Sequence, residues 1–330
     1  MSQRLEELQT WVEGALQMPT VKLEPASTDA SFRRYFRAHA RDRSVIVMDA
    51  PPPAEDCRPF VRVAGLLQAA GVHVPDILAQ DLERGFLLLS DLGRQTYLDV
   101  LNADNADALF ADAIAALIRW QRASRSSVLP VYDRAMLHRE LELFPEWYAA
   151  RYLDLALSTV ERDILASAFR LLEDSALAQP KVFVHRDYMP RNLMLSTPNP
   201  GVLDFQDAVY GPICYDVASL FKDAFISWET LQVNIWRQQY WERAQEAGLP
   251  LPGFPEFERA CDWMGMQRHL KVLGLFARIE YRDGKSGYLK DTPRFLNYVR
   301  ETGKLYKEFT PLLNLLDALE SRSQNRTPIQ

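Results

Sequence analysis

Cysteine is scarce in this sequence, and long apolar runs are missing from it. Three cysteines occur among 330 residues, far apart and without paired spacing, at Cys57, Cys214 and Cys261. Scattered cysteines in odd number favour reduced thiols over a disulfide framework. No run approaches the roughly 20 apolar residues that a membrane-spanning helix needs. Charges interrupt the apolar residues at the start, which predicts an amphipathic helix over residues 1–17 instead of a signal peptide, and hence a cytoplasmic protein.

Positive charge is also in short supply. The 38 lysines and arginines are outnumbered by 44 acidic residues, which gives a formal net charge of −6. This balance argues against nucleic acid or a membrane surface as a partner, although it is compatible with a local basic pocket. The sequence contains no repeats, and its histidines lack zinc-like spacing. With 48% apolar and 25% charged residues it has the composition of an ordinary folded protein, which we expect to be a monomer.

The hydrophobic pattern divides the chain into a β-rich part and a helical part. Before residue 93 it predicts five strands, at residues 21–27, 34–40, 43–51, 74–81 and 84–93, and one helix at 54–70. Further on, apolar residues recur at helical spacing, and Ser158 with Glu161 forms a capping-box signature. The sequence therefore predicts an α+β fold with two lobes, residues 1–93 and 94–330, joined by a hinge near residues 89–93.

Two short segments interrupt the helical part with groups that resist burial. The first reads VFVHRDYMPRNLML, and the second reads GVLDFQD. The centre of the first matches the H-R-D-x-x-x-x-N pattern of kinase catalytic loops. In that chemistry a carboxylate accepts the proton of the attacking hydroxyl, and the pattern assigns this role to Asp187. Oxygen ligands hold magnesium near the phosphates, and the two segments assign this role to Asn192 and Asp204.

The same segments predict local structure. A tight hairpin through residues 196–201 would join two strands and place the two metal ligands on these adjacent strands. The alternative is that Asp187 and Asn192 only cap a loop and that Asp204 only ends a strand, because such residues are common in turns. The complete eight-residue pattern, together with a second aspartate after an apolar strand, favours the catalytic interpretation.

These motifs resemble those of the aminoglycoside phosphotransferase and choline kinase family, and the similarity extends to Gly211-Pro212-x-x-Tyr215-Asp216. The resemblance covers most of the chain and implies a two-lobed, protein-kinase-like fold with ATP and Mg²⁺ as cofactors. It implies that residues 1–93 bind the nucleotide and that residues 94–330 carry the catalytic loop and the acceptor site. It also implies that Asp216, together with His185, supports the catalytic loop.

Two features depart from the family pattern. The turn expected to cover the nucleotide phosphates contains no glycine, and Met48 stands where the third strand should carry a lysine. The nearest cations are Arg33 and Arg34, and an arginine fork suits a phosphate. We therefore expect phosphate contacts from these arginines and from the turn at Ser31 and Phe32. The alternative for the arginines is a solvated hairpin.

The remaining contacts follow from the two-lobe layout. The hinge backbone would hydrogen-bond the adenine, at Leu89, Ser90 and Asp91. Polar groups for the acceptor should come from the helical lobe, where the candidates are Glu146, Trp147 and Arg278. A guanidinium there could bind a carboxylate in bidentate fashion, whereas a salt-bridged helix surface is the alternative for each candidate.

A narrower resemblance points to a substrate. The segments TDASFRRYFRA, VIVMDAPP, LFPEWYAARYL and LGLFARIEYRDGKSGYL are similar to anomeric amino-sugar kinases of cell-wall (peptidoglycan) recycling. This similarity implies ATP-dependent phosphorylation of the C1 hydroxyl of N-acetylmuramate and N-acetylglucosamine. One alternative is a kinase for another acceptor, such as an aminoglycoside or choline. Another is a nucleotide-binding pseudokinase, which the intact Asp187, Asn192 and Asp204 oppose.

Overall fold

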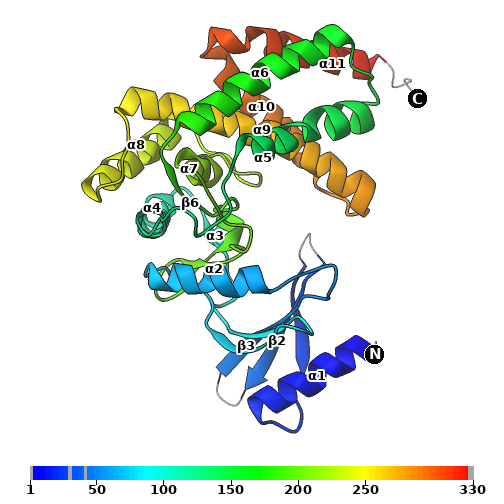
Figure 1. Cartoon of the computed structure of the whole chain (residues 1–330), viewed down its shortest axis with the longest axis vertical. Coiled ribbons are helices and arrows are strands. Elements are labelled where there is room, and N and C mark those ends of the chain that lie inside the picture. Colours follow the sequence, from blue (N-terminus) through cyan, green and yellow to red (C-terminus); the bar gives the residue numbers. More distant parts are fainter. Residues whose placement is uncertain (1–2, 29–31, 41–42, 326–330) are drawn as a thin grey trace. The chain divides into compact units, whose positions relative to one another are not determined.

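The chain forms two compact units in the computed structural model, which describes residues 3–28, 32–40 and 43–325 (Figure 1). Unit 1 comprises residues 1–120 and 190–208, and unit 2 comprises residues 121–189 and 209–330. The chain therefore passes from unit 2 to unit 1 within the HRDYMPRN motif, after Met189. The lobe boundary at residue 93 stays a prediction.

Unit 1 is built on a five-stranded antiparallel sheet with the strand order β1-β2-β3-β5-β4. Its elements are α1 Gln3–Leu16, β1 Leu23–Thr28, β2 Arg34–Ala40, β3 Arg43–Asp49, α2 Arg58–Ala69, β4 Ile77–Asp81, β5 Phe86–Ser90, α3 Tyr97–Val100, most of α4 Ala106–Arg122, η2 Pro190–Asn192, β7 Leu193–Met194 and β8 Gly201–Val202. The five strands of the sheet lie where the sequence predicts them. Helix α2 begins later than expected because Pro59 occupies its first turn.

Helix α1 covers one face of the five-stranded sheet. Its buried Leu8 and Val12 pack in one core cluster with Val45 and Val47 of β3. Because side chains alternate across a strand, the buried Met48 belongs to the opposite face. Figure 1 shows α1 and α2 on opposite sides of the strands. The two faces of β3 therefore carry different neighbours.

Unit 2 is helical and is centred on the 30-residue helix α9, which packs against seven other elements. Its elements are α5 Arg134–Leu141, η1 Phe144–Tyr152, α6 Thr159–Ala178, β6 Lys181–Val184, β9 Val209–Pro212, α7 Cys214–Phe221, α8 Thr230–Glu246, α9 Phe254–Asp283, η3 Leu289–Asp291, α10 Thr292–Lys304, η4 Lys307–Phe309 and α11 Thr310–Gln324. The predicted capping box is present, since the Ser158 N–H donates to the Glu161 carboxylate at 2.7 Å and the Ser158 hydroxyl accepts from the Glu161 N–H. No helix in the described ranges is long and apolar enough to cross a membrane.

Gly274 allows α9 to approach the start of η1 closely. A Cβ atom at this position would lie 2.1 Å from the carbonyl oxygen of Leu143 and 2.6 Å from the backbone nitrogen of Phe144. The segment η1 is a π-helix, and at its end the N–H of Leu153 donates to the carbonyl oxygen of Tyr148, five residues back, at 3.0 Å. Such helices are rare and frequently mark functional regions.

Candidate active site

Asp216 of α7 holds the backbone that leads to Asp187. Its carboxylate is fully buried and accepts the N–H of His185 at 2.7 Å and the N–H of Arg186 at 3.0 Å. Burial raises the pKa of Asp216 to about 7, although the two backbone donors lower it. The Nδ1 atom of the buried His185 lies 3.3 Å from the backbone nitrogen of Asp187, in position to accept its N–H. Hydrogen bonds to Asp216 and His185 therefore fix the backbone of the segment that leads to Asp187.

A second carboxylate, Glu140 of α5, holds the side chain of Arg186. The guanidinium donates to Oε1 of Glu140 at 2.5 Å, and the Lys271 ammonium donates to the same oxygen at 2.9 Å. The Tyr132 hydroxyl and Nε2 of Gln267 donate to Oε2. Burial alone would raise the pKa of Glu140, but the charges of Lys271 and Arg186 lower it to about 2. Glu140 does not stand out in the sequence, because its charged partners, Arg186 and Lys271, are 46 and 131 residues away along the chain.

Asn192 and Asp204 meet at the base of the hairpin formed by β7 and β8. The strands pair as predicted, but each is only two residues long. Asn192 therefore precedes β7 and Asp204 follows β8, so the expectation that both lie on strands is wrong. The carbonyl oxygen of Asn192 accepts the N–H of Leu203 at 2.9 Å, and Nδ2 of Asn192 lies 3.4 Å from Oδ2 of Asp204.

The backbone of Asp204 is in the left-handed region, with φ 62°. The next side chain, Phe205, is fully buried, and its ring lies 4.6 Å from the ring of Phe60 on α2. Nε2 of Gln206 donates to Oδ1 of Asp204 at 2.8 Å. Apolar packing and hydrogen bonds from neutral donors to the Asp204 carboxylate therefore fix this turn.

The donor set of the hairpin suits magnesium. A carboxylate and an amide oxygen are hard ligands, and Mg²⁺ is commonly held by one or two protein carboxylates together with waters and phosphates. A half-turn of the Asn192 amide exchanges its nitrogen for its oxygen on the side that faces Asp204. The residues present therefore fit the cation that the sequence predicts.

Arg34 is bound to a buried carboxylate on the α1 side of the sheet. It pairs in register with Asp49 of β3, and its Nε donates to Oδ2 of Asp49 at 3.0 Å. Asp49 is fully buried and also accepts from Arg4 of α1 at 2.6 Å. Asp49 has the same parity in β3 as Val45 and Val47, so this ion pair lies on the face opposite Met48.

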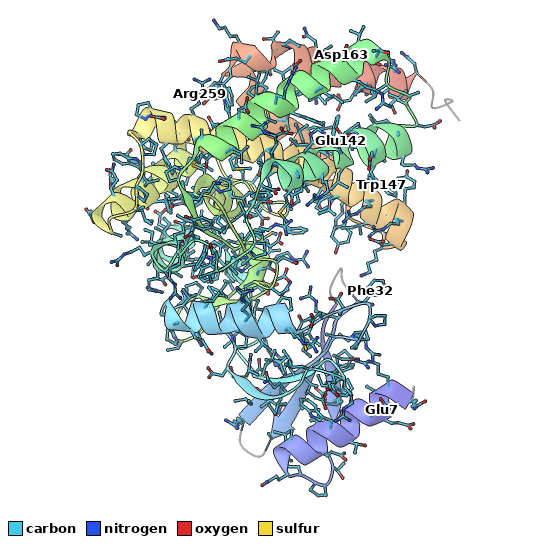
Figure 2. The ribbon with its side chains drawn as sticks, in the orientation of Figure 1. Glu7, Phe32, Glu142, Trp147, Asp163 and Arg259 are labelled. Atoms are coloured by element: carbon cyan, nitrogen blue, oxygen red, sulfur yellow. The ribbon has the colours of Figure 1, made fainter. Side chains whose placement is uncertain are left out.

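Arg33 has a different partner. Its Nε lies 3.3 Å from Oε2 of Glu55, and Oε1 of Glu55 accepts the N–H of Phe32 at 3.1 Å. The Phe32 side chain is 73% exposed (Figure 2). Ser31, the remaining predicted residue of this turn, lies outside the described residues. The two arginines are therefore held by different carboxylates.

The predicted hinge is held by Arg37 of β2, which the sequence analysis did not single out. Leu89 and Ser90 end β5, and the Ser90 N–H already donates to a backbone carbonyl at 2.9 Å. Asp91 accepts from Nε of Arg37 at 2.6 Å and from its Nη2 at 3.1 Å, and the same Nη2 donates to the carbonyl oxygen of Gly93 at 2.7 Å. This bidentate ion pair fixes the end of β5.

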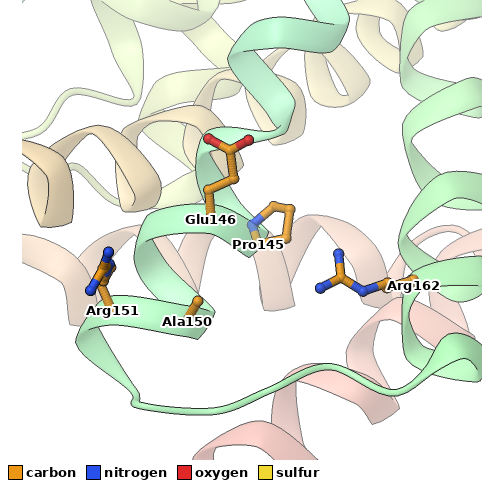
Figure 3. A pocket seen from close by; sticks show the side chains of 5 residues that line it. All are labelled: Pro145, Glu146, Ala150, Arg151 and Arg162. Carbon is orange, nitrogen blue, oxygen red and sulfur yellow. The ribbon is translucent and has the colours of Figure 1, made fainter.

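Unit 2 contains a pocket of about 480 Å³ between η1 and the start of α6 (Figure 3). It is lined by Pro145, Glu146, Ala150, Arg151 and Arg162. Glu146 and Arg151 are five residues apart, which is the hydrogen-bond spacing of a π-helix, so both can project to one side of η1. Of the three predicted acceptor contacts, only Glu146 lines this pocket.

The other two acceptor candidates lie elsewhere in unit 2. Trp147 is on η1 and is partly exposed (Figure 2). Arg278 is half-buried on α9, where burial and the neighbouring charge of Arg282 lower its pKa. The structure therefore does not bring all three acceptor candidates to one pocket.

Comparison with known proteins identifies the family. The model of the phosphotransferase enzyme family (APH) matches residues 22–255. The chain belongs to this family. It is 58% identical to the N-acetylmuramate/N-acetylglucosamine kinase of Pseudomonas aeruginosa over 96% of this chain and 97% of that protein. It is 47% identical to the protein of the same name from Neisseria meningitidis, over 95% of each chain.

Two solved structures share the fold of this chain. Choline kinase LicA from Streptococcus pneumoniae matches with a TM-score of 0.64 and 14% identity, over 90% of this chain and 99% of that one. The gentamicin complex of APH(2″)-IIa matches with a TM-score of 0.61 and 14% identity, over 90% of this chain and 96% of that one. The predicted α+β, protein-kinase-like fold and the family resemblance are both confirmed.

Proposed function

We propose that this phosphotransferase is an ATP- and magnesium-dependent kinase that phosphorylates the C1 hydroxyl of N-acetylmuramate and N-acetylglucosamine. The observation that carries the proposal is the 58% and 47% identity, over nearly the full length, to proteins named for those two sugars. The intact HRDYMPRN pattern supports transfer over mere nucleotide binding. The same proposal places the protein in the cytoplasm and in cell-wall recycling. It takes the protein to be a monomer that binds neither nucleic acid nor a membrane.

In this proposal Asp187 is the catalytic residue that accepts the proton of the sugar hydroxyl. An anomeric hydroxyl is a hemiacetal and is more acidic than an ordinary alcohol, because the ring oxygen withdraws electron density. It therefore demands less of the base. Positioning and charge neutralisation then contribute most of the rate enhancement. Asp216 and His185 support the segment that carries Asp187, through the hydrogen bonds to its backbone.

Asn192 and Asp204 would hold the magnesium ion. A magnesium ion held by these residues would supply positive charge that offsets the negative charge developing on the phosphate oxygens. Asp204 contributes the single full negative charge of this pair, and Asn192 adds a neutral oxygen. The Gln206 hydrogen bond orients the Asp204 carboxylate.

Arg33 is the better candidate for the cation that replaces the third-strand lysine. Glu55 holds it in an ion pair, as a carboxylate holds the lysine in protein kinases. Arg34 instead neutralises the buried Asp49 on the α1 side of the sheet. The Phe32 turn would add backbone contacts to the phosphates, and the backbone at Leu89, Ser90 and Asp91 would bind the adenine.

The residues proposed to contact the sugar are Glu146, Trp147 and Arg278. Glu146 has the strongest support, because it lines a pocket together with two arginines. A carboxylate can accept hydrogen bonds from sugar hydroxyls, and a guanidinium can bind the lactyl carboxylate of N-acetylmuramate.

The test is transfer from ATP, with magnesium, to each sugar and to its 1-O-methyl glycoside, followed by phosphorus NMR. The methyl glycoside keeps every hydroxyl except the anomeric one. The proposal expects a C1 phosphate from both free sugars and no product from either glycoside. A phosphorylated glycoside, or a product that stays reducing, would overturn the anomeric assignment. Absence of product from both sugars, with transfer to an aminoglycoside or choline, would overturn the substrate class.

A further inference from the structure

We infer that Glu140 is a positioning residue, which keeps Asp187 in place by binding the side chain of Arg186. The inference rests on the proposed function, because it takes Asp187 as the proton acceptor. Glu140 itself is buried on α5 and acts only through its neighbour.

The backbone of Arg186 adopts an unusual conformation. Its φ of 77° lies in the left-handed region, which glycine adopts readily and a residue with a Cβ atom adopts at a cost. Such a conformation persists where surrounding contacts over-determine it. Asp216 holds the Arg186 N–H and Glu140 holds its guanidinium, so the residue before Asp187 is fixed at both ends.

Glu140 also neutralises two cations. Arg186 and Lys271 are both largely buried, and both donate to the same oxygen of Glu140. Burial alone would lower the pKa of each cation, but the charge of Glu140 reverses this and raises both. The charge of Asp187 contributes in the same direction to both values. Without Glu140, the two cations would repel one another and compete for the nearby Asp187 carboxylate.

Glu140 is itself held in place by several elements. Glu140 lies on α5 and is bonded to Lys271 and Gln267 of α9, and to the Tyr132 hydroxyl, in addition to Arg186. The Lys271 ammonium also donates to the Tyr215 hydroxyl of α7 at 3.0 Å. Helices from three parts of unit 2 therefore fix the point to which the catalytic segment is tied.

The test compares Glu140→Gln with a matched control, Glu173→Gln. Glu173 is also buried and also binds two basic side chains of α5, Arg134 at 3.0 Å and His138 at 2.9 Å, but it does not bind the catalytic segment. Both variants should lower the temperature of unfolding. Only Glu140→Gln should lower kcat, by about 10- to 100-fold, the range expected when a reacting group is misplaced by about 1 Å. The KM values should change by less than about threefold, since Glu140 is buried and acts through Arg186.

Arg186→Gly provides a second variant if Glu140→Gln folds poorly. Glycine accepts the left-handed backbone without strain, and Glu140 keeps Lys271 as its partner. It should also lower kcat, and the double variant should lose no more than the worse single variant, because both break one interaction. A kcat within about twofold of the wild type in both single variants would overturn the inference, and so would an equal loss of kcat in Glu173→Gln.

Hydrogen exchange gives a readout that needs no substrate. The backbone amides of residues 185–187 should exchange faster in Glu140→Gln than in Glu173→Gln. Equal exchange in the two variants would overturn the inference whatever the substrate is. A wild type that transfers phosphate to neither sugar would instead overturn the proposed function alone.

Discussion

The two halves of the catalytic motif use the same unusual backbone conformation but stabilise it by different means. Arg186, before the proposed base, has φ 77°, and Asp204, the proposed metal ligand, has φ 62°. Buried charges hold the first, through Glu140 and Asp216. Apolar packing of Phe205 and a hydrogen bond from the uncharged amide of Gln206 hold the second. Changes of charge should therefore disturb the geometry of the base more than the geometry of the metal ligands.

The largest effect should come from Asp204→Ala. This change removes the only full charge of the proposed ligand pair while Phe205 still packs on Phe60, so the turn should survive. We expect magnesium-dependent transfer to be abolished, because the charged ligand also offsets phosphate repulsion. The measurement is the rate across a magnesium titration, with Gln206→Ala as a control that keeps the carboxylate. Normal activity of Asp204→Ala at ordinary magnesium would leave Asp204 with a structural role only.

The next largest effect should come from Asp187→Asn. The substitution keeps the size of the side chain and removes its ability to accept a proton. We expect turnover to fall by about 100- to 10,000-fold, the usual contribution of a positioned general base, while ATP affinity and the unfolding temperature stay close to wild type. Single-turnover rates and ATP binding by calorimetry check this. Near-normal turnover would refute the assignment of the base.

A smaller effect should separate Arg33→Ala from Arg34→Ala. If Arg33 contacts a phosphate, its loss should raise the KM for ATP by about tenfold, as expected for one hydrogen bond to a charged group. Arg34→Ala should leave the KM nearly unchanged and instead lower stability by about 1 kcal/mol, because Arg34 is partly exposed and Asp49 keeps its hydrogen bonds from Arg4. Steady-state kinetics and urea unfolding distinguish the two. The opposite pattern would transfer the phosphate contact to Arg34.

The smallest effect should be a pH dependence of protein stability that arises from Glu140, which holds the residue before the proposed base. The pKa of Glu140 is lowered to about 2, so its ionised form stabilises the fold. That contribution is complete above its ordinary pKa of about 4.3 and disappears as the pH falls toward 2. The stability difference between wild type and Glu140→Gln should therefore be larger at pH 7 than at pH 3. Urea unfolding at both values checks this, and a difference independent of pH would contradict it.

Much of the fold could be predicted because its signals are local. The capping box links Ser158 to Glu161, three residues away, and the β7–β8 hairpin joins residues separated by nine positions or fewer. The pairing of Arg34 with Asp49 could also have been found. The register of the β2–β3 hairpin places them opposite one another, and the alternation along β3 separates Asp49 from Met48.

The arrangement around Glu140 could not be predicted in the same way. Arg186 is 46 residues away and Lys271 is 131 residues away, and both contacts depend on how α5 and α9 pack. A single sequence contains many glutamates on helices, and nothing in the local pattern distinguishes this one. The π-helix is similar, because its start packs closely against Gly274 of α9, which is remote along the chain.

Gly274 limits how the pocket beside η1 can be redesigned. A mutant library that tests this pocket as the proposed acceptor site would vary Glu146, Arg151 and Arg162, whose side chains are exposed and tolerate exchange. Position 274 tolerates nothing larger than hydrogen, because even a methyl group would sit 2.1 Å from the Leu143 carbonyl and force η1 away from α9. Selection for altered specificity should therefore accumulate substitutions on the rim of the pocket while Gly274 stays invariant.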